Sequence, residues 1–155
     1  MLNNKLNSMK LIQMYYRATD WLANLKSLPL FFFRLILAYG FYGPATMKWA
    51  NINGIAEWYG SMGIPLPTLN AYLSGTVEIA ALILLPLGLA TRFISIPLII
   101  TMIVAIITVH IGNGFAAGDN GFEIPLYYIL MLVALLINGA GKFSVDHLIS
   151  KRLLK

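Results

Sequence analysis

Long apolar stretches separated by short polar segments dominate the pattern of this 155-residue chain. They run over residues 29–49, 69–90, 93–111 and 122–140, and each comes close to the roughly 20 residues that a helix needs to cross a bilayer. Short connections join them, and helices connected in this way pack as antiparallel neighbours. The pattern therefore predicts an all-α fold, an integral membrane four-helix bundle.

The composition agrees with this interpretation. Hydrophobic residues make up 59% of the chain and charged residues 11%, and the mean hydropathy is +0.75, which excludes an ordinary soluble domain. The chain has no cysteine, so it holds no disulfide, thiolate metal site or thiol redox relay of its own. Any electrons that it handles must be carried by a bound group.

The net charge of +5 is distributed unevenly around the apolar stretches. Basic residues precede the first stretch, occupy the turn between the second and third, and follow the fourth: Lys5, Lys10, Arg17, Lys26, Arg92, Lys142, Lys151, Arg152 and Lys155. Because cytoplasmic segments carry such an excess, we expect both termini in the cytoplasm. From this distribution we expect the positive charge to face the lipid bilayer, and we expect no nucleic acid partner.

Residues 1–28 differ from the rest, because leucines and methionines alternate there with basic side chains. Tyr15, Tyr16 and Trp21 are of types enriched at the membrane–water interface. We predict an N-terminal amphipathic interfacial helix, and a segment that docks a partner protein is the competing interpretation. Residues 147–155 form a basic cytoplasmic tail.

Two ionisable residues, Arg34 and Glu78, lie inside the apolar stretches, where a charge is costly and marks a partner or a pathway. Their depths differ by roughly 10 Å, which a long arginine and helix tilt could bridge, so a structural ion pair is one expectation. In a second, Arg34 reaches the headgroups and Glu78 stays protonated, because a dry interior disfavours the carboxylate. In a third, Glu78 accepts a proton or anchors a ligand.

Further polar side chains fall at the outer ends of the apolar stretches. They are Lys48, Trp49, His110, Glu123 and, one turn further along the last stretch, Tyr127. We expect Lys48, His110 and Glu123 to lie at about the same depth, beneath the aromatic residues of the 50–68 loop. Such a constellation could bind and protonate the headgroup of a quinone or another small polar ligand.

A structural role competes with the site role of Glu123. The sequence Asn120-Gly121-Phe122-Glu123 fits a capping box, in which the glutamate reaches back to the backbone of the capping asparagine. Pro125 complicates this arrangement, because it would fall at the fifth helical position and remove a backbone hydrogen bond. Both interpretations of Glu123 remain open at this point.

His110 is also open to two interpretations, as an interfacial hydrogen-bonding residue or as a proton carrier. A copper site with Met47 and Met62 would combine suitable ligand types on the same outer side. No spacing motif supports it, so we predict no metal site.

Five segments of the chain resemble the DoxX family of small four-helix membrane proteins: RLILAYGFYGPATMKW, GIPLPTLNAYLSGTVEIAALILLPLGLATR, TVHIGNGF, NGFEIPLYYILML and GAGKFSVD. The details look closest to a branch encoded beside bufferin-type copper-responsive peptides. The resemblance implies a four-transmembrane-helix domain over residues 29–146 in a prokaryotic cytoplasmic (inner) membrane, associated with quinone-linked redox complexes. The family-like polar positions fall on Arg34, Lys48, Glu78, Arg92, His110, Glu123 and Asp146.

Two functions follow from these observations. In the leading hypothesis the protein is a redox subunit or accessory that binds a quinone-like ligand at the outer end. His110 and Glu123 would then act as proton donor and acceptor, Lys48 would orient the ligand, and Glu78 would relay protons or hold Arg34. In the alternative it is a non-catalytic scaffold, or a maturation or export helper, for a secreted copper-binding peptide.

Overall fold

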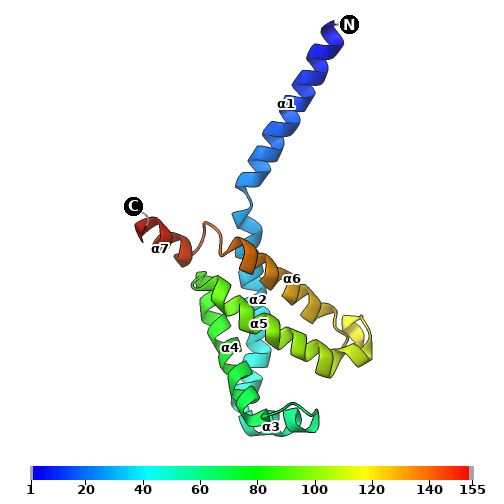
Figure 1. Cartoon of the computed structure of the whole chain (residues 1–155), viewed down its shortest axis with the longest axis vertical. Coiled ribbons are helices and arrows are strands. Elements are labelled where there is room, and N and C mark those ends of the chain that lie inside the picture. The colour runs from blue at the N-terminus through cyan, green and yellow to red at the C-terminus, as the bar shows by residue number, and fades with distance from the viewer. Residues whose placement is uncertain (1, 154–155) are drawn as a thin grey trace.

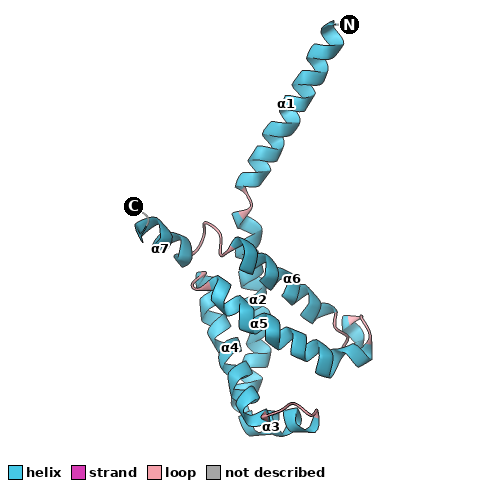
Figure 2. Ribbon diagram, viewed as in Figure 1, coloured by secondary structure: helices cyan, strands magenta, loops and turns pink. Residues whose placement is uncertain are grey.

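The computed structural model describes residues 2–153, and within this range the chain is helical with short connections, as Figure 1 and Figure 2 show. Its α-helices are α1 (Leu2–Asn24), α2 (Ser27–Ala50), α3 (Ile52–Ser61), α4 (Pro67–Leu87), α5 (Thr91–Ala105), α6 (Glu123–Asn138) and α7 (Val145–Leu153). A π-helix, Ile106–His110, continues α5, and 3₁₀ turns follow at Ile111–Asn113 and Ala117–Asp119. The all-α prediction is confirmed for the described residues.

Three stretches are long and apolar enough to cross a membrane: Ile12–Ala50, which includes α2, then Pro67–Leu87 and Thr91–Asn113. Helix α6 has 16 residues and so covers about 24 Å, less than the roughly 30 Å of a hydrocarbon core. It ends early because Gly139, with φ 76°, leaves the helical conformation. The structure thus supports several membrane crossings, and a fourth full-length span remains a prediction.

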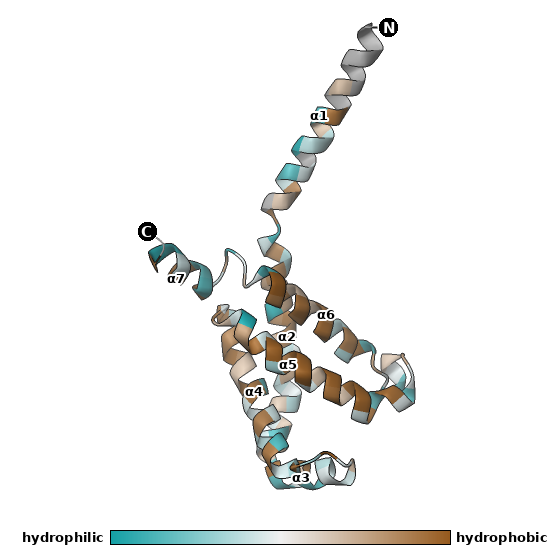
Figure 3. Cartoon of the chain, viewed as in Figure 1, coloured by the Kyte–Doolittle hydropathy of each residue, from teal (hydrophilic) through white to brown (hydrophobic). Residues whose placement is uncertain are grey.

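Apolar side chains from four helices meet in one core. Helix α2 packs along α4, α5 packs along α6, and contacts of α4 with α5 and of α2 with α6 close the bundle. Leu37 of α2, Leu85 of α4, Leu98 of α5 and Leu132 of α6 are fully buried there. Figure 3 shows that α5 and α6 carry the densest run of apolar residues. These four helices carry most of the side chains of the candidate site.

A tight turn joins α4 to α5, and a residue far along the sequence caps the start of α5. Gly88 ends α4 in the left-handed conformation, with φ 64°. The carboxylate of Asp146, at the start of α7, accepts hydrogen bonds from the backbone N–H groups of Ala90 (2.8 Å) and Thr91 (3.0 Å). Since these groups open α5, Asp146 supplies the anionic cap that a helix N-terminus favours.

The helices diverge with distance from that turn. Figure 1 shows α4 running to α3 and α5 running to the 111–122 loop, with these two segments lying apart at the far end. Helix α3 packs on α4 there. This divergence leaves room between the two helix pairs at one end of the bundle, which we call the outer end.

Helix α1 extends away from the bundle (Figure 1), and its aromatic residues Tyr15, Tyr16 and Trp21 are exposed. The helical conformation expected for this segment is observed. Its amphipathic placement on the membrane surface stays a prediction.

Candidate functional site

A cavity of about 1030 Å³ fills the space between the diverging helices at the outer end. Helices α2, α4, α5 and α6 supply its walls, and the segment from α3 to α4 contributes Trp58, Tyr59 and Met62. Most of the lining is apolar, with a few polar side chains among it, which is the usual constitution of a small-molecule site. We call this space the outer cavity.

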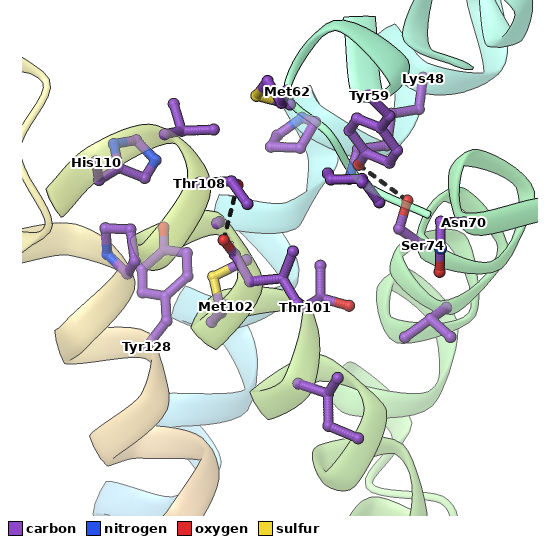
Figure 4. A pocket seen from close by; sticks show the side chains of 18 of the residues that line it. Lys48, Tyr59, Met62, Asn70, Ser74, Thr101, Met102, Thr108, His110 and Tyr128 are labelled. Carbon is purple, nitrogen blue, oxygen red and sulfur yellow. Dashed lines mark hydrogen bonds between the residues drawn. The ribbon is translucent and has the colours of Figure 1, made fainter. Parts of the chain in front are cut away.

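Figure 4 shows the polar lining residues in two groups that face one another across the outer cavity. Lys48, Tyr59, Asn70 and Ser74 form the group on the side of α3 and α4. His110, Thr108 and Tyr128 belong to the group on the side of α5 and α6. A ligand between the groups would meet hydrogen-bonding partners at both sides and apolar surface elsewhere.

Lys48 and Glu78 form a buried ion pair beside the outer cavity. The Lys48 Nζ lies 2.5 Å from Glu78 Oε1, and the two residues are 7% and 1% exposed. Gly75, one turn before Glu78, lies against the neighbouring Trp49, because a Cβ there would be 3.2 Å from the indole Nε1. The second carboxylate oxygen, Oε2, is buried without a hydrogen-bond partner among the described residues. Lys48 lines the cavity, whereas Glu78 lies behind it and is not among the lining residues.

The predicted ion pair between Arg34 and Glu78 is therefore wrong. Arg34 is buried at the opposite end of the bundle, where its Nη1 donates to the carbonyl oxygens of Leu85 (3.1 Å) and Pro86 (3.2 Å). Its Nη2 donates to the carbonyl oxygen of Phe143 at 2.5 Å. The residues that carry these carbonyls are seven and eight positions after Glu78 in α4, which is about 11 Å along the helix axis. The guanidinium therefore binds the end of α4 and not Glu78. Arg34 ties α4 to the segment before α7 and lies outside the outer cavity.

His110 lines the outer cavity at the end of the π-helix that continues α5. Its Nδ1 lies 2.8 Å from the carbonyl oxygen of Asn120. Because a carbonyl can only accept, Nδ1 carries the hydrogen, and in the neutral ring Nε2 is the nitrogen that accepts a proton. Asn113 donates to the same carbonyl at 3.2 Å, so the loop fixes the histidine in one tautomer.

Glu123 has different partners from both of those considered in the sequence. Its Oε2 accepts from the backbone N–H of Ala117 at 2.9 Å, and its Oε1 accepts from the hydroxyl of Tyr127 at 3.0 Å. The capping box with Asn120 is not formed, because Phe122 precedes the first helical residue and Asn120 lies in the left-handed conformation, with φ 59°. Glu123 and Tyr127 thus hold the 111–122 loop, and neither belongs to the described lining of the outer cavity.

Trp49 points away from the predicted cluster. Its ring meets that of Tyr72 edge to face, with centroids 6.0 Å apart, and the residue is 46% exposed. It packs against Gly75 of α4 on the outside of the bundle. Of the five predicted outer residues, the structure brings only Lys48 and His110 to the cavity lining.

Tyr128 is a lining residue that the sequence reasoning missed. A stripe of four-residue steps from Glu123 leads to Tyr127, whereas the ring that faces the cavity belongs to the next residue. Gly40 makes room for it, because any Cβ at that position would overlap the Tyr128 ring. Phe41 packs beside it, with ring centroids 5.6 Å apart. Gly40 could have signalled this packing, since a glycine inside an apolar helix often marks a close neighbour.

Ser74 was also not assigned to a site, whereas Tyr59 is one of the aromatic residues of the 50–68 loop expected above the polar cluster. The Tyr59 hydroxyl and the Ser74 Oγ lie 3.1 Å apart, and this hydrogen bond attaches α3 to α4 (Figure 4). Within residues 2–153 no group of three His, Asp or Glu side chains is arranged to hold a metal ion. The donors present suit an organic ligand with oxygen atoms.

Comparison with known proteins identifies the family to which the chain belongs. A sequence model described as DoxX matches residues 29–111, more than half of the chain. An uncharacterized protein of Haemophilus influenzae is 33% identical over 122 residues, which cover 76% of this chain and 81% of that protein. An uncharacterized membrane protein of Mycobacterium tuberculosis is 36% identical over 101 residues, or 59% of this chain and 62% of that protein.

A Bacillus subtilis protein with the name "Putative oxidoreductase CatD" is 30% identical over 120 residues, covering 76% of this chain and 84% of that protein. No solved structure is significantly similar to the chain. The family match and these relatives agree with the apolar helices of the structure. The chain belongs to the DoxX family of membrane proteins.

Proposed function

We propose that this protein is a redox subunit or accessory that binds a quinone-like molecule in the outer cavity. The observation that carries the proposal is the buried Lys48–Glu78 pair, whose lysine lines a largely apolar space of about 1030 Å³. A buried charge pair is costly to maintain, and in a membrane protein it marks a site of ligand or proton traffic. A name that includes "oxidoreductase" for one relative adds support.

The chemistry of the cavity suits a quinone ring. A quinone carries two carbonyl oxygens on an apolar ring, so it needs hydrogen-bond donors on opposite sides and apolar contacts between them. Lys48 provides an ammonium group on one side, where it would stabilise negative charge on the first oxygen. His110 provides an imidazole on the other side, and the Tyr128 hydroxyl lies in the same group.

Reduction of a quinone to a quinol consumes two electrons and two protons. A bound redox group or a partner redox protein would supply the electrons, because the chain has no cysteine to carry them. His110 and the Lys48–Glu78 pair would deliver the protons, and Glu78 could recharge Lys48 through their 2.5 Å hydrogen bond. The unpartnered Oε2 of Glu78 leaves one oxygen free to take up the next proton.

The other predicted site residues act through these groups. Glu123 and Tyr127 order the loop whose Asn120 carbonyl holds His110. Trp49 packs against Gly75 beside Lys48, and Arg34 fixes the far end of α4. In this proposal they are positioning residues rather than catalytic ones.

The proposal includes a location in a bacterial inner membrane with both termini in the cytoplasm. The basic side chains Arg92, Lys142, Lys151 and Arg152 all lie at the end of the bundle opposite the outer cavity, which is where the positive-inside rule places them. The outer cavity then faces the periplasmic half of the membrane.

One observation favours the second candidate function, a scaffold for a secreted copper-binding peptide. All ten residues from 111 to 120 are exposed on the outer side, so the loop offers surface to a partner. This function predicts a stoichiometric peptide in the purified complex and no quinone affinity. The two candidates are therefore separable by one preparation.

The test is a titration of the full-length protein in detergent with a short-chain ubiquinone. Binding is measured by the quenching of tryptophan fluorescence, because Trp58 lines the cavity. We expect saturable quenching, and a Lys48→Gln/Glu78→Gln variant with at least about tenfold weaker affinity, since each charge-assisted hydrogen bond contributes about 1.5–3 kcal/mol. Glu57→Gln, an exposed carboxylate on α3, is the matched control and should bind normally. Absence of saturable binding by the folded wild-type protein would exclude the proposal.

A further inference from the structure

A second cavity, of about 480 Å³, lies at the end of the bundle opposite the outer cavity. The starts of α2, α5 and α7 and the segment that follows α6 enclose it. Because helices α2, α5 and α6 begin or end here, the cavity falls where a membrane protein meets the lipid headgroups. We call it the inner cavity.

Most of the charged side chains in its lining are basic. Lys26, Arg92 and Lys142 contribute to it, and Asp146 is its one acidic residue within residues 2–153. Both oxygens of Asp146 already accept from the N–H groups at the start of α5. The negative charge of Asp146 is thus engaged within the protein, which leaves the cationic side chains of the lining to a ligand.

Hydrogen bonds fix the guanidinium of Arg92 and the backbone of Lys142. Arg92 donates from Nη2 to the carbonyl oxygen of Ile137 at 3.2 Å, which uses one of its five N–H groups. Its guanidinium lies over Gly139, where an added Cβ would be 3.4 Å from Nε. The backbone N–H of Lys142 donates to the Oγ of Ser27 at 3.1 Å, so the segment that carries this lysine is attached to the start of α2.

Large apolar side chains are exposed at the same level. Phe93 lines the inner cavity and is 79% exposed, and Ile137, whose carbonyl receives Arg92, is 69% exposed. In a membrane-embedded bundle such side chains meet acyl chains rather than water. A site with cations and adjoining lipid-facing apolar groups suits a molecule that has an anionic head and a hydrocarbon tail.

We propose that the inner cavity binds the phosphate headgroup of an anionic phospholipid, with Arg92 and Lys142 on the phosphate oxygens and Phe93 against an acyl chain. Arginine matches phosphate geometry through two parallel N–H groups, and basic pockets at the headgroup level bind such lipids. The site is independent of the quinone proposed for the outer cavity, because the two cavities share no lining residue.

The test is native mass spectrometry of the full-length protein titrated with phosphatidylglycerol, cardiolipin or phosphatidylcholine. We expect retention of the two anionic lipids and not of phosphatidylcholine. In an Arg92→Gln/Lys142→Gln variant the affinity should fall about 30-fold, since each cation near an anionic headgroup contributes about 1 kcal/mol. Glutamine at position 92 removes one exposed hydrogen bond to Ile137 and no buried packing, so the fold should be preserved.

The matched control is Lys151→Gln/Arg152→Gln, which removes the same charge from exposed positions on α7 outside the lining. It should change lipid affinity by less than about threefold. If the Arg92 variant loses stability, Lys142→Gln alone must still weaken binding about fivefold, because no hydrogen bond of that side chain is removed.

Three results would overturn the proposal. One is equal loss of affinity in the two double variants, which would indicate a diffuse surface effect. Another is equal retention of phosphatidylcholine. The third is full displacement of the lipid by millimolar inorganic phosphate, which would identify a site for the free anion.

Discussion

Lys48→Met is the substitution that most sharply tests the buried ion pair. Methionine has nearly the length of lysine and keeps the apolar part of the side chain, so the change removes the charge with little loss of packing. Glu78, 1% exposed, then has no cation 2.5 Å from Oε1. Removal of one partner of a buried pair costs about 3–5 kcal/mol.

Protonation limits this penalty. Conversion of an ordinary glutamate to its neutral form at pH 7 costs about 3.7 kcal/mol, from its reference value of about 4.3 and 1.36 kcal/mol per pH unit. At pH 5 the same conversion costs about 1 kcal/mol. The variant should therefore lose about 3–4 kcal/mol of unfolding free energy at pH 7 and only about 1 kcal/mol at pH 5.

Reversible unfolding in mixed detergent and SDS micelles at the two pH values gives both free energies. Lys48→Met/Glu78→Leu should recover most of the loss, because replacement of both partners by apolar groups is close to neutral. Lys151→Met, an exposed lysine on α7, should change the free energy by less than about 0.5 kcal/mol. A loss below about 1 kcal/mol at pH 7, or the same loss at both pH values, would refute the buried, ionised pair.

Substitutions at three further positions test the packing that positions the site. Gly88→Ala should destabilise the protein by more than 1 kcal/mol in the same unfolding assay, because φ is 64° and the new Cβ would overlap the Arg34 guanidinium. Asp146→Ala should cost about 1–2 kcal/mol through loss of the α5 cap, and Asp146→Asn, which retains an acceptor, should cost less; equal losses would contradict the cap. Gly40→Ala should displace Tyr128 and weaken quinone binding with a smaller effect on stability, and unchanged affinity would exclude Tyr128 from the binding site.

The helices were largely predictable from the sequence, and the reasons are local. Runs of about 20 apolar residues have few alternatives to helix in a membrane protein, since every backbone polar group must be bonded internally. The end of α6 was less certain, because Asn138-Gly139 sits within an apolar run and only the left-handed conformation of Gly139 terminates the helix. That detail determines whether the fourth helix reaches the length of a full span.

The partner of Glu78 could not be read from depth alone. The carbonyl oxygens that bind the Arg34 guanidinium lie about 11 Å beyond Glu78 along α4. The nearer cation is Lys48, whose Nζ lies 2.5 Å from Glu78 Oε1. The packing of α2 along α4 therefore determines which charges meet.

The outer cluster was predicted in part. Lys48 and His110 do line one cavity, because both end their apolar stretches at the same end of the bundle. Glu123 lies at that side too, but a loop of irregular backbone precedes it, and its N–H groups need acceptors. The backbone N–H of Ala117 donates to the Glu123 carboxylate, and no spacing rule predicts this contact.

Photolabelling with a quinone analogue is the most direct test of the proposed function. A short-chain ubiquinone with a photoreactive tail, cross-linked to the full-length protein in lipid nanodiscs and mapped by peptide mass spectrometry, identifies the residues that contact it. The account predicts labels on the lining of the outer cavity, at Met62, Tyr59 or Tyr128, which excess unlabelled quinone suppresses and the Lys48→Gln/Glu78→Gln variant lacks. Labels spread over the lipid-facing surface, with no competition by free quinone, would contradict it.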